Sequence, residues 1–340
     1  MMTMNHMRDI SVVICAYTTD RWNDLVAAVK SIHQQTLQPR EVIVVIDHNT
    51  ELLGRAQSIL DGVIVIENRE PRGLSGARNS GIAQAKGDII AFMDEDAIAE
   101  PEWLERLSRD YADTHVLGIG GAVEPLWLSG QPGWFPREFN WVVGCSYQGM
   151  PTTTTAVRNP IGCNMSFRRT VFETMGGFRH GIGRVGTRPV GDEETEIGIR
   201  TKRYWPNGVI LYEPQARVHH RVPAHRANWR YFWSRCYAEG QSKAILSRIA
   251  GAKDGLSSER TYTLRTLPLG VMKGIADTLT GRDTQGFTRA IAIVTGLGVT
   301  TAGYVVGTVL GWLANHEATD SSMLPVGDNQ SLAADLVQPG

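Results

Sequence analysis

Residues 87–97 read GDIIAFMDEDA, an apolar run that ends in three acidic side chains. The part at 88–94 predicts a strand buried on both faces, because such strands lack the alternation of polar and apolar residues found at a sheet surface. Similar runs occur at 10–17 (ISVVICAY), 41–47 (EVIVVID) and 62–67 (GVIVIE), with helical spacing of apolar residues between the runs at 21–35, 52–60 and 75–85. This alternation predicts an α/β fold with a Rossmann-like, doubly wound, mostly parallel sheet.

The acidic triplet follows the fourth predicted strand directly. Ligands of open α/β sheets bind outside the carboxyl ends of the strands. In an extended segment alternate side chains share a face, so Asp94 and Asp96 point together and Glu95 points away. Two convergent carboxylates suit an octahedral Mg²⁺ or Mn²⁺ that also holds a diphosphate. A solvated acidic turn is the alternative, but the preceding strand and Pro101, which opens the next helix, favour the metal site.

A glycine-rich segment lies just upstream, at 71–88 (PRGLSGARNSGIAQAKGD). It places Gly73, Gly76 and Arg78 at the start of a helix, where the helix N-terminus and the arginine both favour a phosphate group. A glycine loop with a surface arginine is the alternative. Asp47 ends the second strand without a cationic neighbour in the sequence, and it either accepts from a nucleotide base or caps the next helix.

Composition narrows the function classes. The 340 residues are 42% hydrophobic, which excludes wholesale disorder, and 34 basic against 35 acidic residues do not favour a nucleic-acid partner. Four widely spaced cysteines predict buried reduced thiols rather than disulfides or a zinc site. Gly181–Gly186 matches GxGxxG, but no apolar strand precedes it, so it is not a dinucleotide fingerprint.

The order of six segments resembles the family 2 glycosyltransferases, which have the GT-A fold. The first four are SVVICAYT (11–18), VIVVIDHNT (42–50), GLSGARNSGI (73–82) and GDIIAFMDEDA (87–97), and the last two are NPIGCNMSFRRTVFETMGGF (159–178) and GDEETEIGIR (191–200). The resemblance covers roughly residues 9–222, about two thirds of the chain. It is specific for the family and leaves the sugar and the acceptor open.

The resemblance implies roles for several of these residues. The nucleotide-sugar site would comprise Ala16, Tyr17, Thr18, Asp47, Arg78 and Asp94, with the base held by the first four. The metal, Mn²⁺ or Mg²⁺, would be bound by Asp94 and Asp96. Many members have a paired Asp-Asp where this chain has IDHNT, so a single aspartate is available for the base contacts.

The acidic cluster at 192–194 resembles the family segment that carries the catalytic base. The alignment puts Glu194 at the position of the base and Glu193 just before it. A carboxylate there can take the proton of an acceptor hydroxyl as this hydroxyl attacks the anomeric carbon. Many members have Asp at this place. The alternative is that the cluster only complements a helix N-terminus.

His219 and His220 end an extended segment, so their imidazoles should face opposite sides. Some GT-A enzymes use a histidine here as a third metal ligand, and the spacing from Ala216 favours His220. A structural or phosphate-contacting histidine is the alternative.

Residues 290–314 carry no charge, and as a helix they would be roughly 37 Å long against a bilayer core of ~30 Å. Arg282 and Arg289 precede this span, and acidic residues without Lys or Arg follow it. The positive-inside rule then predicts a single-pass protein of the cell membrane with residues 1–289 in the cytoplasm. A buried core helix is the alternative. Its glycines Gly303, Gly307 and Gly311 would allow a homodimer or packing against another segment of the chain.

The predicted organisation has five parts: an N-terminal tail (1–8), a GT-A domain (9–223), a helical, interfacial segment (224–285), a transmembrane anchor (286–316) and a flexible acidic tail (317–340). The expected function is inverting, metal-dependent transfer of a sugar from a nucleotide-diphosphate sugar, foremost a UDP-sugar. The expected acceptor is a hydroxyl of a lipid-linked saccharide, a glycolipid or a polysaccharide precursor of the cell envelope. The alternatives are a polyprenyl-phosphate sugar synthase of the same fold and a catalytically silent membrane scaffold.

Overall fold

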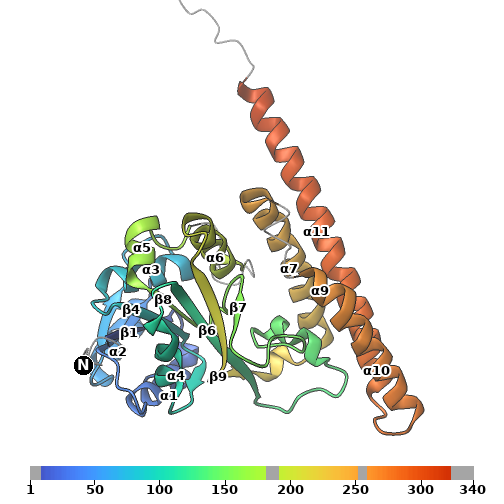
Figure 1. Ribbon diagram of the computed structural model, residues 1–340, viewed down its shortest axis with the longest axis horizontal. Coiled ribbons are helices and arrows are strands. Elements are labelled where there is room, and N and C mark those ends of the chain that lie inside the picture. The colour runs from blue at the N-terminus through green and yellow to red at the C-terminus, as the bar shows by residue number, and fades with distance from the viewer. Residues whose placement is uncertain (1–8, 181–190, 252–258, 323–340) are drawn as a thin grey trace, which may run out of the picture.

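The computed structural model describes residues 9–180, 191–251 and 259–322 (Figure 1). The N-terminal tail, the Gly181–Gly186 match and most of the acidic tail lie outside these ranges. All four cysteines lie within them and are buried free thiols, as the sequence predicts.

Four parallel strands form one half of a nine-stranded sheet, in the order β3-β2-β1-β4. They are β1 (Ile10–Ala16), β2 (Glu41–Ile46), β3 (Ile64–Glu67) and β4 (Ile89–Asp94). The helices between them are α1 (Trp22–His33), α2 (Thr50–Ile59) and α3 (Leu74–Gln84). β1 is buried throughout and β4 up to Met93, because helices cover both faces of the sheet here. The predicted α/β alternation is confirmed to within a few residues at each boundary.

The other half of the sheet is mixed in direction. β8 (Asn164–Arg168) pairs antiparallel with β4, and the order continues β8-β6-β9-β5, with β7 on β9. The strands are β5 (Ala97–Ala99), β6 (Val116–Trp127), β7 (Thr155–Val157) and β9 (Val209–Val222). A parallel neighbour needs a crossover connection, whereas these strands are reached through irregular segments that leave the direction open. The parallel pairs of the sheet are therefore those within β1–β4 and the β6–β9 pair.

Short helices complete the domain around this sheet. They are α4 (Trp103–Ser108), α5 (Arg169–Met175) and α6 (Glu193–Tyr204), together with the 3₁₀ segments η1 (Thr19–Arg21), η2 (Arg109–Ala112), η3 (Arg137–Val143) and η4 (Ala224–Arg226). Trp103 is fully buried, and its indole Nε1 donates to Asn164 Oδ1 at 2.7 Å. Asn164 also donates to the carbonyls of Ala122 and Ala216, so one buried amide joins α4, β6, β8 and β9.

Three longer helices flank the sheet on one side (Figure 1). They are α7 (Trp229–Ala250), α10 (Leu267–Leu279), which follows α9 (Glu259–Thr261) and the π-turn η5 (Tyr262–Thr266), and α11 (Gly286–Ser322). α11 runs along both α7 and α10 before its C-terminal part extends beyond the rest of the protein. The predicted span is thus one continuous helix that packs on α7 as far as Gly311.

α7 and α11 approach closely at glycines. A Cβ on Gly303 would lie 2.2 Å from the carbonyl oxygen of Tyr237, and one on Gly240 would lie 2.1 Å from that of Thr300. Gly307 faces Gln241 and Ala244 in the same way. The glycine face of α11 therefore packs against the chain's own helix, and a homodimer through this face stays a prediction that would require α7 to move.

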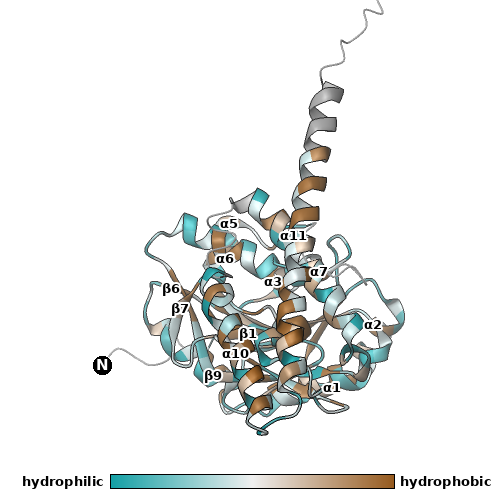
Figure 2. Ribbon diagram, turned by 90° about the vertical axis from the view of Figure 1, so that its right-hand side faces the viewer, coloured by the Kyte–Doolittle hydropathy of each residue, from teal (hydrophilic) through white to brown (hydrophobic). Residues whose placement is uncertain are grey.

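The outer sides of α10 and α11 expose large apolar side chains. These include Leu269, Met272, Leu279, Phe287, Ile291, Val294, Val309 and Leu310. Figure 2 shows how the hydrophobic residues are distributed along these two helices. Residues Gly286–Leu313 are long and apolar enough to cross a membrane, and 28% of their most apolar window is buried. A core helix of a soluble domain would be mostly buried, so α11 is a candidate membrane anchor.

Candidate active site

A cavity of about 920 Å³ opens at the carboxyl ends of β1, β2 and β4 and extends to α7 and α11. Cys15, Asp47 and Asp94 line its sheet end. Leu297, Thr300 and Tyr304 of α11 also line it. The cavity lies where open α/β sheets bind ligands, and the apolar helix forms part of its wall.

Three potential metal ligands meet in this cavity. One ligand atom from each of Asp94, Asp96 and His220 lies within 4.8 Å of the others. Asp94 ends β4, Asp96 follows two residues later, and the pairing of β5 with β9 places His220 opposite Ala97. Two carboxylate oxygens and an imidazole nitrogen suit Mn²⁺ and are acceptable to Mg²⁺. The residues present therefore fit the predicted metal.

The two histidines face opposite ways, as the sequence predicts. His220 Nε2 lies 3.2 Å from Asp96 Oδ1, and its Nδ1 lies 3.8 Å from Cys145 Sγ. His219 Nε2 instead lies 3.2 Å from Glu100 Oε1, outside the cluster. Nε2 is therefore the His220 nitrogen aimed at the carboxylates, and Cys145 contacts the opposite nitrogen of the ring.

Arg21 neutralises part of the acidic cluster and was not predicted from the sequence. Its Nη1 lies 2.7 Å from Glu95 Oε1 and 3.1 Å from Asp96 Oδ2. Burial raises the pKa of Asp96, but the charges of His220, Arg21 and Arg226 outweigh burial and hold this pKa well below its usual range. Asp96 is therefore ionised, as a metal ligand must be. Burial lowers the pKa of His220, but the Asp96 carboxylate outweighs burial and raises this pKa well above its usual value, so His220 would have to release a proton to act as the third ligand.

Arg78 joins the metal cluster to the acidic segment of α6. Its Nη1 lies 2.7 Å from Glu193 Oε1, and its Nη2 donates to the Gly162 carbonyl at 3.0 Å and lies 3.6 Å from Asp94 Oδ1. Its side chain is 3% exposed, which rules out a surface arginine. A buried guanidinium beside a diphosphate site can bind phosphate oxygens directly or organise the carboxylates around them.

The two predicted base candidates have different surroundings. Both residues line the cavity, but Glu193 is buried and paired with Arg78, whereas Glu194 is half-buried. Within the described residues no ion pair involves Glu194. Burial, and then the neighbouring carboxylates Glu193 and Asp192, raise the pKa of Glu194 well above its ordinary value. A carboxylate with a raised pKa is a stronger base, so the surroundings of Glu194 suit proton abstraction better than those of Glu193.

Asp47 holds the loop before α3. Its Oδ2 accepts from the Gly73 amide at 3.0 Å, and its Oδ1 accepts from Asn68 Nδ2 at 2.6 Å. Gly73 has φ 130°, a conformation that favours glycine. The helix cap on α2 comes from Asn49, so the capping alternative for Asp47 is wrong. Asp47 still lines the cavity.

Of the remaining residues predicted to hold the nucleotide base, two line the cavity and one does not. Ala16 and Tyr17 line the cavity. Thr18 is not among its lining residues, and its hydroxyl accepts from the Asp20 amide at 3.2 Å, which caps η1.

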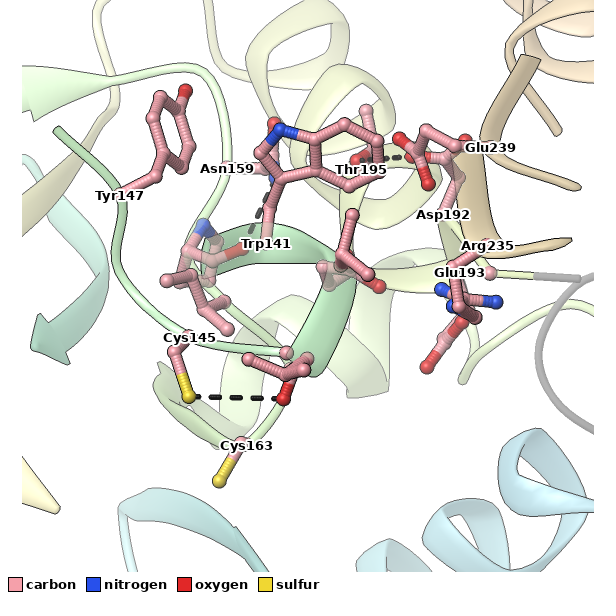
Figure 3. Close-up of a pocket in the computed structure, with 18 of the residues that line it drawn as sticks. Trp141, Cys145, Tyr147, Asn159, Cys163, Asp192, Glu193, Thr195, Arg235 and Glu239 are labelled. Carbon is pink, nitrogen blue, oxygen red and sulfur yellow. Dashed lines mark hydrogen bonds between the residues drawn. The ribbon is translucent and has the colours of Figure 1, made fainter. Parts of the chain in front are cut away.

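The far wall of the cavity comes from segments that the sequence left without a role (Figure 3). Trp141 and Tyr147 line one side, and Arg235 and Glu239 of α7 line another. Lys243 of α7 also lines the cavity. For the α7 residues, no motif could have signalled a site, because only the packing of α7 brings them to the cavity.

The fold and the site together indicate the class of protein to which this chain belongs. A mixed α/β sheet whose parallel half ends in an Asp-x-Asp cluster, with a further acidic helix facing it, is the arrangement of GT-A glycosyltransferases. The family model "Glycosyl transferase family 2" matches residues 11–176. The chain belongs to family 2 of the glycosyltransferases, and it is a glycosyltransferase by that membership, as the sequence predicted.

Two curated relatives extend over most of the chain. A glucosyl-dolichyl phosphate glucuronosyltransferase of Haloferax volcanii is 36% identical over 245 residues, which cover 71% of this chain and 78% of the relative. The succinoglycan biosynthesis protein ExoM of Rhizobium meliloti is 24% identical over 74% of this chain and 83% of its own length.

A solved structure shares the fold. The crystal structure of GalNAc-T7 with UDP, GalNAc and Mn²⁺ superimposes with a TM-score of 0.51 at 18% identity. The similarity covers 74% of this chain and 55% of that one. At this identity the likeness concerns the fold alone.

Proposed function

We propose that this protein is an inverting, metal-dependent glycosyltransferase that moves a sugar from a nucleotide-diphosphate sugar to a hydroxyl of a lipid-linked saccharide. One observation carries the proposal: the cavity that holds Asp94, Asp96 and Glu194 is also lined by the apolar helix α11. A polar reaction centre and a membrane-directed helix thus share one cavity.

The donor end of the proposed site is the carboxyl edge of the sheet. Asp94, Asp96 and His220 would hold Mn²⁺ or Mg²⁺, which when bound stabilises charge on the leaving diphosphate. Arg78 adds a fixed positive charge 3.6 Å from Asp94 Oδ1. The Asp47 side chain and the Tyr17 end of β1 lie where the base would bind. UDP is the first nucleotide to test, because the structural neighbour was crystallised with UDP.

Glu194 is the proposed general base. It would take the proton from the acceptor hydroxyl while that oxygen attacks the anomeric carbon from the side opposite the diphosphate, which inverts the configuration. Glu193 is a poorer candidate, because its carboxylate is already paired with Arg78 in a buried ion pair.

The acceptor end of the site supports a lipid-linked substrate. Thr300, Thr301 and Tyr304 bring α11 to the cavity, and the opposite side of the same helix exposes apolar side chains. The Haloferax relative is named for a dolichyl phosphate-linked sugar and glucuronosyl transfer. Glucuronosyl transfer to a polyprenyl-phosphate-linked sugar is therefore the first pair of substrates to assay.

Membrane attachment through α10 and α11 belongs to the same proposal. Their exposed apolar side chains would contact lipid, and α11 also lines the cavity. A single pass with residues 1–289 in the cytoplasm stays a prediction. Cysteine-accessibility labelling on the two sides of intact cells, at added cysteines near Asp283 and Asp335, would test it.

The decisive experiment uses the full chain in detergent or nanodiscs with a panel of UDP-, GDP- and dTDP-sugars, Mn²⁺ and polyprenyl-phosphate-linked sugars. Transfer to a sugar hydroxyl with inverted configuration, lost in D94N and in E194Q, supports the proposal. Turnover that survives E194Q would instead indicate a polyprenyl-phosphate sugar synthase, whose phosphate acceptor needs no base. Neither nucleotide-sugar binding nor turnover would indicate a silent scaffold.

A further inference from the structure

We propose that Ser242 and Lys243 of α7 are positioning residues, which hold the first turn of α6 so that Glu194 faces the reaction centre. Lys243 Nζ lies 2.7 Å from Asp192 Oδ1, and Ser242 Oγ accepts from the Gly191 amide at 3.3 Å. Two adjacent residues of α7 thus bind the two residues that lead into α6. The inference rests on the proposed function only for its kinetic consequences.

The held segment needs support, because Asp192 has a left-handed backbone. Its φ is 74° and its ψ is 14°, and only one other described residue besides glycine, His48, has positive φ. Such a conformation costs an L-residue free energy and persists where the surroundings impose it. Asp192 Oδ1 accepts both from Lys243 and from the Thr195 hydroxyl, at 3.2 Å. These contacts hold the turn that precedes Glu193 and Glu194.

The ion pair is buried and well supported. The side chains of Asp192 and Lys243 are 6% and 12% exposed, and Glu239 Oε1 lies 3.3 Å from the same Nζ. A buried ion pair adds little net stability over an apolar pair, but it strongly disfavours other arrangements of its partners. That property suits a positioning role for Lys243 rather than a merely stabilising one.

α7 itself is held from behind by the apolar helix. Gly240 lies between Glu239 and Ser242, and a Cβ there would lie 2.1 Å from the Thr300 carbonyl of α11. One side of α7 therefore contacts α11 while residues of the next turn bind the start of α6. The lipid-facing helix and the proposed base are connected through a single helix.

The test compares K243M, which keeps the length of the side chain and removes its charge, with K243R and with K273M. Lys273 is an exposed lysine of α10 that does not line the catalytic cavity. We expect K243M to lower kcat on the order of 10- to 100-fold, with the KM for the donor changed less than about threefold, because misplaced catalytic groups cost rate rather than substrate binding. K243R should recover most of kcat, and K273M should equal the wild type.

Hydrogen exchange of the first-turn amides of α6 provides a readout that needs no turnover. These amides should exchange faster in K243M and in S242A than in the wild type, while those of α3 stay unchanged. An unchanged kcat and exchange pattern in K243M, or a K243R variant as impaired as K243M, would overturn the inference. If the wild type transfers no sugar, the proposed function fails, and the exchange experiment still decides the positioning role. If K243M does not fold, kcat and hydrogen exchange are both measured on S242A instead.

Discussion

Arg78 Nη1 lies 2.7 Å from Glu193 Oε1, and the side chains of both residues are almost fully buried. The pair joins α3, which lies within the glycine-rich segment, to α6, which carries the proposed base. It therefore sets the distance between the donor and acceptor ends of the cavity. Its partners are 115 residues apart in the chain.

Removing one partner of this pair should destabilise the fold severely. R78M leaves the Glu193 carboxylate buried without its cation, and the expected loss is about 3–5 kcal/mol of unfolding free energy. Urea denaturation followed by circular dichroism measures it. The double variant R78M/E193Q should recover much of the loss. Breaking the more exposed Arg106–Glu102 pair with R106M should cost less than about 1 kcal/mol; equal effects from the two pairs would contradict this account.

The affinity for Mn²⁺ should depend on His220 and not on the adjacent His219. D94N, D96N and H220N should each weaken Mn²⁺ binding in the presence of UDP, on the order of 10²-fold for the two carboxylates. H219N is the matched control, because its ring contacts Glu100 outside the cluster. Isothermal titration calorimetry measures the affinities. If H219N and H220N behaved alike, the third ligand would have to come from another residue.

The acidic side of the pH–rate profile should report Glu194. Because burial raises its pKa, kcat should fall with decreasing pH at values above those expected for an ordinary glutamate. The D96N variant cannot serve as control, since it removes a proposed metal ligand. E67Q, which changes an exposed glutamate at the end of β3, should leave the profile unchanged. A wild-type profile that stays flat down to the ordinary glutamate pKa would exclude Glu194 as the base.

The raised pKa of Glu194 also predicts that its ionised carboxylate makes the folded protein less stable. A carboxyl whose pKa is higher in the folded state contributes stability at low pH, and this contribution is lost as the pH rises through the folded-state pKa. The melting temperature of E194Q should therefore exceed that of the wild type at about pH 8, and the difference should shrink toward about pH 5. Scanning calorimetry across this range checks the trend, and a difference that grew toward low pH would have the wrong sign.

The close approach of α7 and α11 should matter for catalysis. G303L cannot be accommodated without a shift, because a Cβ alone would lie 2.2 Å from the Tyr237 carbonyl. We expect it to lower kcat at least tenfold by displacing the cavity wall, on the scale that misplacement of about 1 Å costs. G298L on the same helix has open space and should behave as the wild type. Activity assays in nanodiscs, with UDP binding as a folding check, separate the two.

Several features followed from local sequence alone. The β-branched runs predicted β1–β4 because strands buried on both faces leave no polar residue to interrupt the pattern. Asp94, Asp96 and Arg78 could be singled out because they stand next to a strand end and a helix start, where local geometry already limits their chemistry. The resemblance then supplied Glu194 and His220, and the two carboxylates that meet His220, Asp94 and Asp96, lie more than 100 residues before it in the chain.

Other features could not be read from any window of the sequence. The mixed half of the sheet, the ion pairs of Arg21 and the approach of Lys243 to Asp192 depend on contacts between segments far apart in the chain. The role of Asp47 changed for the same reason, because its carboxylate bonds to Gly73 of a later loop.

The clearest division concerns residues 290–314. Their sequence determined a long apolar helix, because 25 uncharged residues are enough to form a helix that could cross a bilayer. Only the tertiary structure decided that one side of this helix packs on α7 at glycines and lines the cavity of the proposed active site, while the other side stays exposed. Hydropathy averages over all sides of a helix, whereas packing depends on which side meets which neighbour, and that is set by the rest of the chain.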